Sequence, residues 1–239
     1  MRNRVIGLTI GAIGLSVLLV NVQCQVQSRM DHTSSLPPQQ GATHLLSRQV
    51  KGQVLTSAEM PALSLKFDNA FKYIGGQDFI LYEVARAEQH FFVDADKQGK
   101  IKRLYWVQFE GYLPDNSHTY HYKVDKSVKI GGLDFIADAA PRNTRAGLGR
   151  PDSDANRGRA FLEAKGYRMA GDDILTQRLV HLVDEAKRNE LMIIYMEDLS
   201  GMRLTAADLS PNGRAASQWG EISKGLLERA VKGMEVLPR

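Results

Sequence analysis

The 239-residue sequence has little cysteine and lacks the motifs that mark several common enzyme classes. Its one cysteine, Cys24, excludes a disulfide within the chain and a cysteine-rich zinc or iron–sulfur site, because each needs at least two thiolates. G-x-S-x-G, H-E-x-x-H and P-loop lysine motifs are missing, and Gly147-Leu148-Gly149 lacks the third glycine of a dinucleotide fingerprint. We therefore expect no cofactor. What is present is a globular composition, with 43% hydrophobic and 24% charged residues.

The N-terminus has the pattern of an export signal. Arg2 and Arg4 precede an uncharged, apolar run from Val5 to Val22, which is followed by Gln23 and Cys24. A translocon recognises a short basic region followed by such a run, and the run is close to the roughly 18 to 20 residues that span a bilayer. Residues 1–24 are thus expected to be either a cleaved signal or a retained membrane anchor. The folded part is expected to be exported, to the periplasm or an equivalent compartment.

The charge balance argues against a nucleic-acid partner. The net charge of the whole chain is +4, and Arg2 and Arg4 carry two of those charges, so residues 25–239 have a net charge of only +2. Proteins that bind the phosphate backbone present a concentrated basic surface, which such a balance does not supply. Membrane contact is expected only through residues 1–24, if they are retained.

The rest of the chain divides into a linker and a single domain. Residues 25–60 are polar and lack a sustained apolar period, which is typical of a flexible linker. From residue 63 to 137, short runs of aromatic and β-branched residues separated by turn sequences predict about six antiparallel strands, one of them over residues 117–124. Gly75-Gly76 predicts a tight hairpin turn, and Gly131-Gly132 predicts a bulge or bend.

Helical spacing dominates after residue 152. It predicts one helix from residue 153 or 154 to 165, a second from residue 172 or 173 to 186, and a last one from 214 to 234. Between them, Leu191 to Met196 is apolar at both parities, which indicates a strand covered on both faces. The resulting class is α+β: a curved, mostly antiparallel sheet of about six to seven strands, or a partly open barrel, packed with C-terminal helices. Residues 61–239 form this domain.

Polar and aromatic side chains alternate along the predicted strands between residues 88 and 122. If these strands pair in sequence order, residues of matching parity gather on one polar and aromatic face. A histidine beside a carboxylate is a usable acid–base pair, and aromatic side chains supply the walls of a small-molecule site. The catalytic candidates are His90, Glu88, His118 and Glu110, and the ligand-binding candidates are Trp106, Gln108, Tyr120 and Phe92. The alternative is that this face simply meets water.

Arginines cluster around the start of the first predicted helix. Five of them lie between residues 142 and 159, and the free backbone N–H groups of a helix N-terminus favour anions. Arg142, Arg145 and Arg150 are therefore candidates for binding an anion, unless they are ordinary solvated surface residues. No metal site is expected, because His118 and His121, three apart on a strand, lie on opposite faces.

Three functions fit these patterns. The favoured one is an exported, non-catalytic module that binds a small, partly apolar ligand between the curved sheet and its helices. The second is an acid–base enzyme of the isomerase, cyclase or hydrolase type that uses a histidine–carboxylate pair. The third is a structural or interaction module without a pocket, which a large exposed apolar patch would mark.

Overall fold

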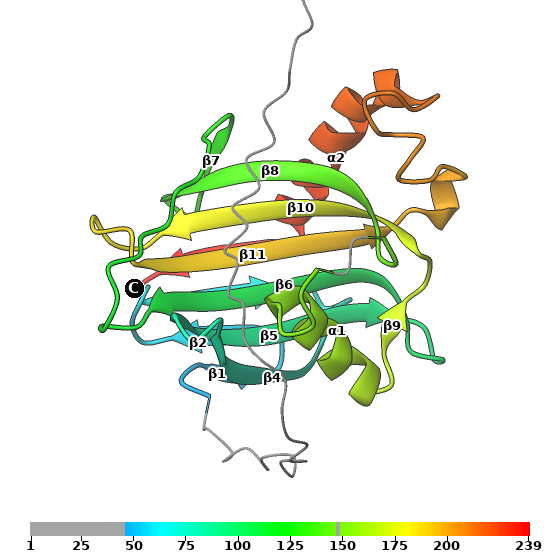
Figure 1. Ribbon diagram of the computed structural model, residues 1–239. Coiled ribbons are helices and arrows are strands. Elements are labelled where there is room, and N and C mark those ends of the chain that lie inside the picture. The colour runs from blue at the N-terminus through cyan, green and yellow to red at the C-terminus, as the bar shows by residue number, and fades with distance from the viewer. Residues whose placement is uncertain (1–45, 147–148) are drawn as a thin grey trace, which may run out of the picture. The chain divides into compact units, whose positions relative to one another are not determined.

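The computed structural model describes residues 46–146 and 149–239, which form two antiparallel sheets and two α-helices (Figure 1). The large sheet has the strand order β4-β5-β6-β11-β10-β8-β7, with short β9 paired in parallel to the start of β6, and the small sheet has the order β1-β2-β3-β12. The strands are β1 (Gln49–Lys51), β2 (Val54–Ser57), β3 (Leu63–Phe67), β4 (Lys72–Leu81), β5 (Ala85–Ala95), β6 (Lys100–Tyr112), β7 (Ser127–Ile130), β8 (Leu133–Asn143), β9 (Arg168–Met169), β10 (Asp173–Leu182), β11 (Asn189–Asp198) and β12 (Met234–Pro238). The helices are α1 (Asp154–Ala164) and α2 (Trp219–Lys232), with single 3-10 turns at η1 (Ser200–Met202) and η2 (Ala216–Gln218).

The predicted α+β class and mostly antiparallel sheet are confirmed. The large sheet is curved but does not close into a barrel, and the described residues contain more strands than the sequence indicated, eight in one sheet and four in the other (Figure 1). Two of the additional strands lie in the segment that the sequence predicts to be a linker. β1 and β2 fall within residues 46–60, so the linker predicted for residues 25–60 does not extend to residue 60; residues 25–45 lie outside the described part.

The inner face of the large sheet carries the main core. Here the small sheet and α2 pack on the sheet through a continuous apolar cluster. Phe67 of β3 lies with its ring centroid 4.1 Å from that of Phe92, and Leu226 of α2 is fully buried. The Tyr105 hydroxyl donates to the Ala230 carbonyl at 2.6 Å, which satisfies a polar group that would otherwise be buried without a partner.

The outer face of the sheet carries a second apolar cluster beneath α1. α1 begins where the sequence predicts, because the Ser153 side chain accepts from the backbone N–H of Asn156, and it ends just before Gly166, whose φ is +82°. Phe161 stacks on Phe91 at 5.2 Å. Gly158 permits this close approach, since a Cβ there would lie 3.2 Å from the Phe91 ring.

β11 is covered on both faces, as its apolar residues at both parities predict. Leu191, Ile193 and Tyr195 belong to the inner cluster, and Met192 and Ile194 belong to the outer one. The strand lies between β6 and β10 in the middle of the sheet (Figure 1). Since neither face of β11 meets open solvent, every side chain along its centre faces either the core or the space under α1.

The helix predicted for residues 172–186 is wrong, because Asp173–Leu182 of that stretch form the strand β10. Leu175 and Leu179 are four residues apart, a spacing that places side chains on one side of a strand as well as of a helix. Pairing with the neighbouring strands β8 and β11, together with the β-branched residues Ile174, Thr176 and Val180 of this stretch, decides in favour of the sheet. The last helix is also shorter than predicted, since α2 begins at Trp219 and the chain returns to the small sheet as β12.

Three turn and strand predictions are also wrong. Gly75 and Gly76 lie inside β4, at a bulge, and the hairpin turn follows at Tyr82 and Glu83, both of which have positive φ. Gly131-Gly132 is the tight turn between β7 and β8 rather than a bulge or bend. Residues 117–124 form no strand; Tyr120 of this segment donates through its backbone N–H to the Lys187 carbonyl in the β10–β11 turn.

Candidate functional site

A cavity of about 970 Å³ lies on the outer face of the large sheet. Its floor is formed by β6, β11, β10 and β8, and its walls are formed by α1, by the segment around Thr144 and by the segment around Met169. The volume is at the upper end of the range of about 300 to 1,000 Å³ that is usual for small-molecule sites. We call this space the outer-face cavity.

The centre of the floor is apolar. Strand pairing places Trp106 of β6 beside Ile194 of β11, and Leu104 beside Met196, with all four side chains on the outer face. Met192 extends this surface by one more outward position along β11. Such a floor supplies affinity for an apolar body through surface removed from water.

Two buried polar atoms in the floor have no hydrogen-bond partner within the described residues. They are the indole Nε1 of Trp106 and the hydroxyl of Thr176, which both line the cavity and are only 5% and 7% exposed. A buried donor without a partner costs roughly 1 to 3 kcal/mol, so each such group calls for an explanation. Both can donate, and an acceptor in the cavity would satisfy them.

One end of the cavity is acidic. Glu110 and Glu190 are direct cross-strand partners on β6 and β11, and both line the cavity. Tyr120 donates to Glu110 at 2.9 Å and Tyr122 donates to Glu190 at 2.6 Å. Burial raises the pKa of Glu190 to about 7, with the charge of Glu110 acting in the same direction and the Tyr122 hydrogen bond opposing it. Burial likewise raises the pKa of Glu110.

The opposite end of the cavity is rich in arginine. Arg142 at the end of β8 and Arg168 at the start of β9 line it, and neither makes an ion pair within the described residues. Arg145 also lines this end but is held by Asp172 at 3.0 Å. The third anion-binding candidate, Arg150, lies outside the cavity lining, where it pairs with Asp152 and stacks on Tyr82.

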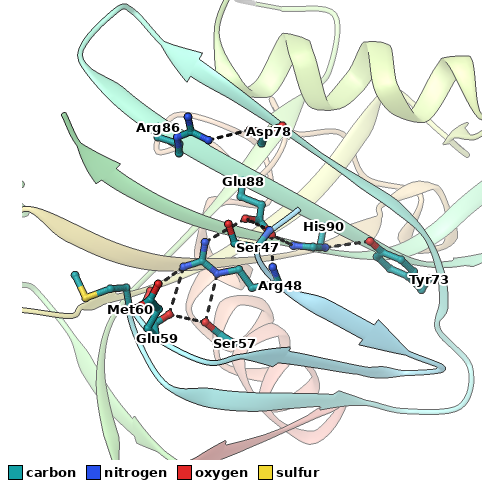
Figure 2. Close-up of polar contacts among 10 residues, drawn as sticks. All are labelled: Ser47, Arg48, Ser57, Glu59, Met60, Tyr73, Asp78, Arg86, Glu88 and His90. Carbon is teal, nitrogen blue, oxygen red and sulfur yellow. Dashed lines mark hydrogen bonds and ion pairs between the residues drawn. The ribbon is translucent and has the colours of Figure 1, made fainter. Parts of the chain in front are cut away.

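Glu88 and His90 do form a hydrogen-bonded pair, but on the inner face of the sheet (Figure 2). His90 Nε2 donates to Glu88 Oε1 at 2.8 Å, and the other ring nitrogen of His90 lies 3.0 Å from the Tyr73 hydroxyl. Arg48 donates to the same carboxylate through its side chain at 3.1 Å and through its backbone N–H at 2.9 Å. We call Arg48, Glu88, His90 and Tyr73 the inner polar chain.

The central residues of the inner polar chain are buried, and their burial and hydrogen bonds together determine the pKa of Glu88. Glu88 and His90 are 3% and 0% exposed, and neither belongs to the lining of the outer-face cavity. Burial would raise the pKa of Glu88, but hydrogen bonds from His90 and Arg48 and the Arg48 charge outweigh it and lower the pKa to about 2. These residues tie the segment before β1 to the large sheet.

The predicted common face therefore holds for only part of its residues. Trp106, Gln108, Glu110 and Tyr120 gather on the outer side, where Gln108 is fully buried and donates to Glu110. Glu88 and His90 lie on the other face, because Glu88 pairs with Phe109 and His90 pairs with Val107. Phe92 is also on the inner face, in the core. His118 is exposed beside Tyr112 and does not line the cavity.

Several residues of the cavity were not predicted from the sequence. Glu190 precedes the apolar run of β11 at the same parity as Met192 and Ile194, so a carboxylate in phase with one buried face was the available signal. Thr176 and Arg178 were hidden by the incorrect helix prediction. In the part of the chain that the structure describes, no cluster of three or more histidine, cysteine or acidic side chains is arranged to hold a metal.

Residues 1–24, for which the sequence predicts a signal or anchor, lie outside the described residues. Within residues 46–146 and 149–239, neither α1 nor α2 is long and apolar enough to cross a membrane. No protein-family model matches the chain, and comparison with curated proteins and with solved structures finds no significant similarity.

Proposed function

We propose that this chain is an exported module that binds one small, partly apolar molecule in the outer-face cavity. The observation that carries the proposal is the combination of an apolar floor with two buried, unpartnered donors, Trp106 Nε1 and the Thr176 hydroxyl. Apolar walls supply affinity in small-molecule sites, and a few placed polar groups supply orientation. The predicted signal at residues 1–24 supports the exported location.

The burial pattern favours binding over histidine-based acid–base catalysis. The histidine–carboxylate pair that the enzyme alternative needs, His90 with Glu88, is enclosed between the two sheets. A general base must come within hydrogen-bond reach of its substrate, directly or through one water. The cavity lining within the described residues contains no histidine. The cavity itself also favours binding over an interaction module without a pocket.

The two tryptophans of the chain allow a site-specific test. Trp106 lies in the cavity floor, and Trp219 lies at the start of α2 among the residues that pack on the inner cluster. In the full-length chain, Trp219→Phe leaves Trp106 as the sole indole fluorophore, and Trp106→Phe leaves Trp219. The probe is 1-anilinonaphthalene-8-sulfonate, which combines aromatic rings with a sulfonate.

We expect the probe to quench tryptophan emission saturably in Trp219→Phe and to leave the emission of Trp106→Phe nearly unchanged. Equal quenching of both variants would indicate nonspecific surface binding, and the absence of any response in Trp219→Phe would contradict the proposal. Circular dichroism of both variants checks that each is folded.

A further inference from the structure

The polar groups of the outer-face cavity are sorted along its length. Arg142, Ile174 and Asp198 form one cross-strand row at the arginine end, and the row of Glu110 and Glu190 lies at the other end. Asp198 and Glu190 are eight residues apart on β11, which is roughly 26 Å at 3.3 Å per residue. The two ends are therefore separated by more than the length of a small polar ligand.

Of the two unpartnered donors, Thr176 lies nearer to the arginines and Trp106 lies midway between the two ends of the cavity. Thr176 is one outward position from the Arg142 row, because it pairs with Ala140. Trp106 is one further outward position along, in the row of Ile194 and Arg178. The sequence of groups from the arginine end is thus a guanidinium, a hydroxyl and an indole N–H, and all three can donate.

The other charges at the arginine end do not cancel this arrangement. Arg145 is paired with Asp172, and Arg178 is paired with Asp138 at 2.7 Å. Arg159 of α1 donates to the Thr144 carbonyl, and the exposed Glu163 is the acidic residue of α1 that lines the cavity toward its C-terminus. Asp198, in the same row as Arg142, adds one carboxylate whose Oδ1 has no partner within the described residues. Arg142 and Arg168 together outnumber it and leave this end with an excess of positive charge.

The acidic end would repel an anion and would accept hydrogen bonds from donors on a ligand. Glu110 and Glu190 occupy it together with Asp154 at the start of α1. Tyr120 and Gln108 donate to Glu110, Tyr122 donates to Glu190, and the charge of Arg178 also acts on Glu190. A ligand with an acceptor-bearing, negatively charged head would therefore lie in one direction only. Its head would be at the arginine end and its apolar body would lie over Ile194 and Met192.

From this order of groups we infer that the ligand is an amphipathic organic anion, held with its carboxylate, sulfonate or phosphate head at Arg142 and Arg168. The inference rests on the proposed function and adds the ligand class and its orientation. Guanidinium groups bind such heads through charge-assisted hydrogen bonds. Trp106 Nε1 and the Thr176 hydroxyl donate to further acceptors along the same molecule.

The test compares three dissolved probes with the same ten-carbon chain: decanoate, decan-1-ol and decylamine. Each is titrated into the full-length Trp219→Phe protein, with Trp106 emission as the readout. We expect decanoate to bind about tenfold or more tightly than decanol, as expected for a charge-assisted hydrogen bond, and decylamine to bind most weakly. Arg142→Gln combined with Arg168→Gln should remove the advantage of decanoate over decanol.

Arg150→Gln is the matched control, because Arg150 lies in the segment that follows β8 but outside the cavity lining. It should alter none of the three affinities. Equal binding of decanoate and decanol would overturn the assignment of the head group while leaving the proposed function intact. Tightest binding of decylamine would assign the head to the carboxylates instead. If the anilinonaphthalene probe also fails to bind, the proposed function itself fails.

A membrane surface is a second source of the same anionic chemistry. Vesicles of phosphatidylglycerol present such heads without offering a dissolved monomer. A response to these vesicles together with no response to dissolved decanoate would place the anion on a membrane and overturn the inference of a dissolved ligand in the outer-face cavity.

Discussion

Glu88→Gln removes the charge at the centre of the inner polar chain while keeping the shape of the side chain. Glu88 accepts from the backbone N–H groups of Ser47 and Arg48, from the Arg48 side chain and from His90 (Figure 2). The amide retains only one acceptor oxygen and leaves the Arg48 charge, on a side chain 14% exposed, without its partner. The variant should therefore be markedly less stable than the parent protein.

Two independent arguments give the magnitude. The pKa of Glu88 falls from an ordinary value of 4.5 to about 2, and a difference of this size corresponds to about 3 kcal/mol of folding free energy. Removing one member of a buried ion pair costs roughly 3 to 5 kcal/mol in other proteins. We expect Glu88→Gln to lower the free energy of unfolding by about 3 kcal/mol at pH 7.

The pH dependence provides a sharper test. Because the pKa is lowered in the folded state, the stabilisation is fully present above the unfolded pKa of about 4.5 and is lost as the pH falls toward about 2. Urea unfolding followed by circular dichroism should show the two proteins converging in stability over that interval.

Asp78→Asn is the control, since the ion pair of Asp78 with Arg86 lies nearby on the β4–β5 hairpin and Arg86 is 55% exposed (Figure 2). This substitution should cost no more than about 1 kcal/mol. A Glu88→Gln protein within about 0.5 kcal/mol of the parent, or a difference that does not change with pH, would refute the reasoning.

Three further predictions concern the cavity and the core. Glu190→Gln should stabilise the protein at pH 8 by about 3 kcal/mol, because the raised pKa of Glu190 makes folding less favourable as the pH rises from about 4.5 through about 7. Urea unfolding at pH 5 and pH 8 measures the difference in stability between the two proteins. An equal difference at both pH values would contradict this prediction. Ser153→Ala should lower the free energy of unfolding by about 1 kcal/mol, because it removes the N-cap of α1. Ser210→Ala is a surface control. Thermal unfolding of Ser153→Ala that matches the parent protein would disprove the capping role. Leu226→Ala should cost about 2 to 5 kcal/mol, because Leu226 is fully buried where α2 packs on the inner face, and a loss below about 1 kcal/mol would show that this face is loosely packed.

The elements of the fold follow from the sequence where one signal dominates. Ser153 and Gly166 delimit α1 as predicted, because a capping side chain and a residue with positive φ act locally. The apolar residues at both parities between Leu191 and Met196 correctly indicate a strand covered on both faces. The strand β10 was wrongly predicted as a helix, because leucines four residues apart lie on one side of a helix and on one side of a strand.

The site was harder to predict, because its composition depends on strand register. Counting parity within each strand correctly grouped Trp106, Gln108 and Glu110 with one another. Relating them to Glu88 required the register across the β5–β6 turn, where a bulge between Asp94 and Ala95 shifts the pairing. A change of one residue in register transfers a whole set of side chains to the other face, and a single sequence does not reveal it.

The most direct test of a ligand in the outer-face cavity is native mass spectrometry of the full-length protein purified from its own host. We predict a stoichiometric, non-covalent adduct of a small organic anion that is lost in Ala140→Trp, because Ala140 lines the cavity beside Thr176 and a larger side chain would fill the site. An apo mass for the parent protein, or an adduct that Ala140→Trp retains, would contradict the account.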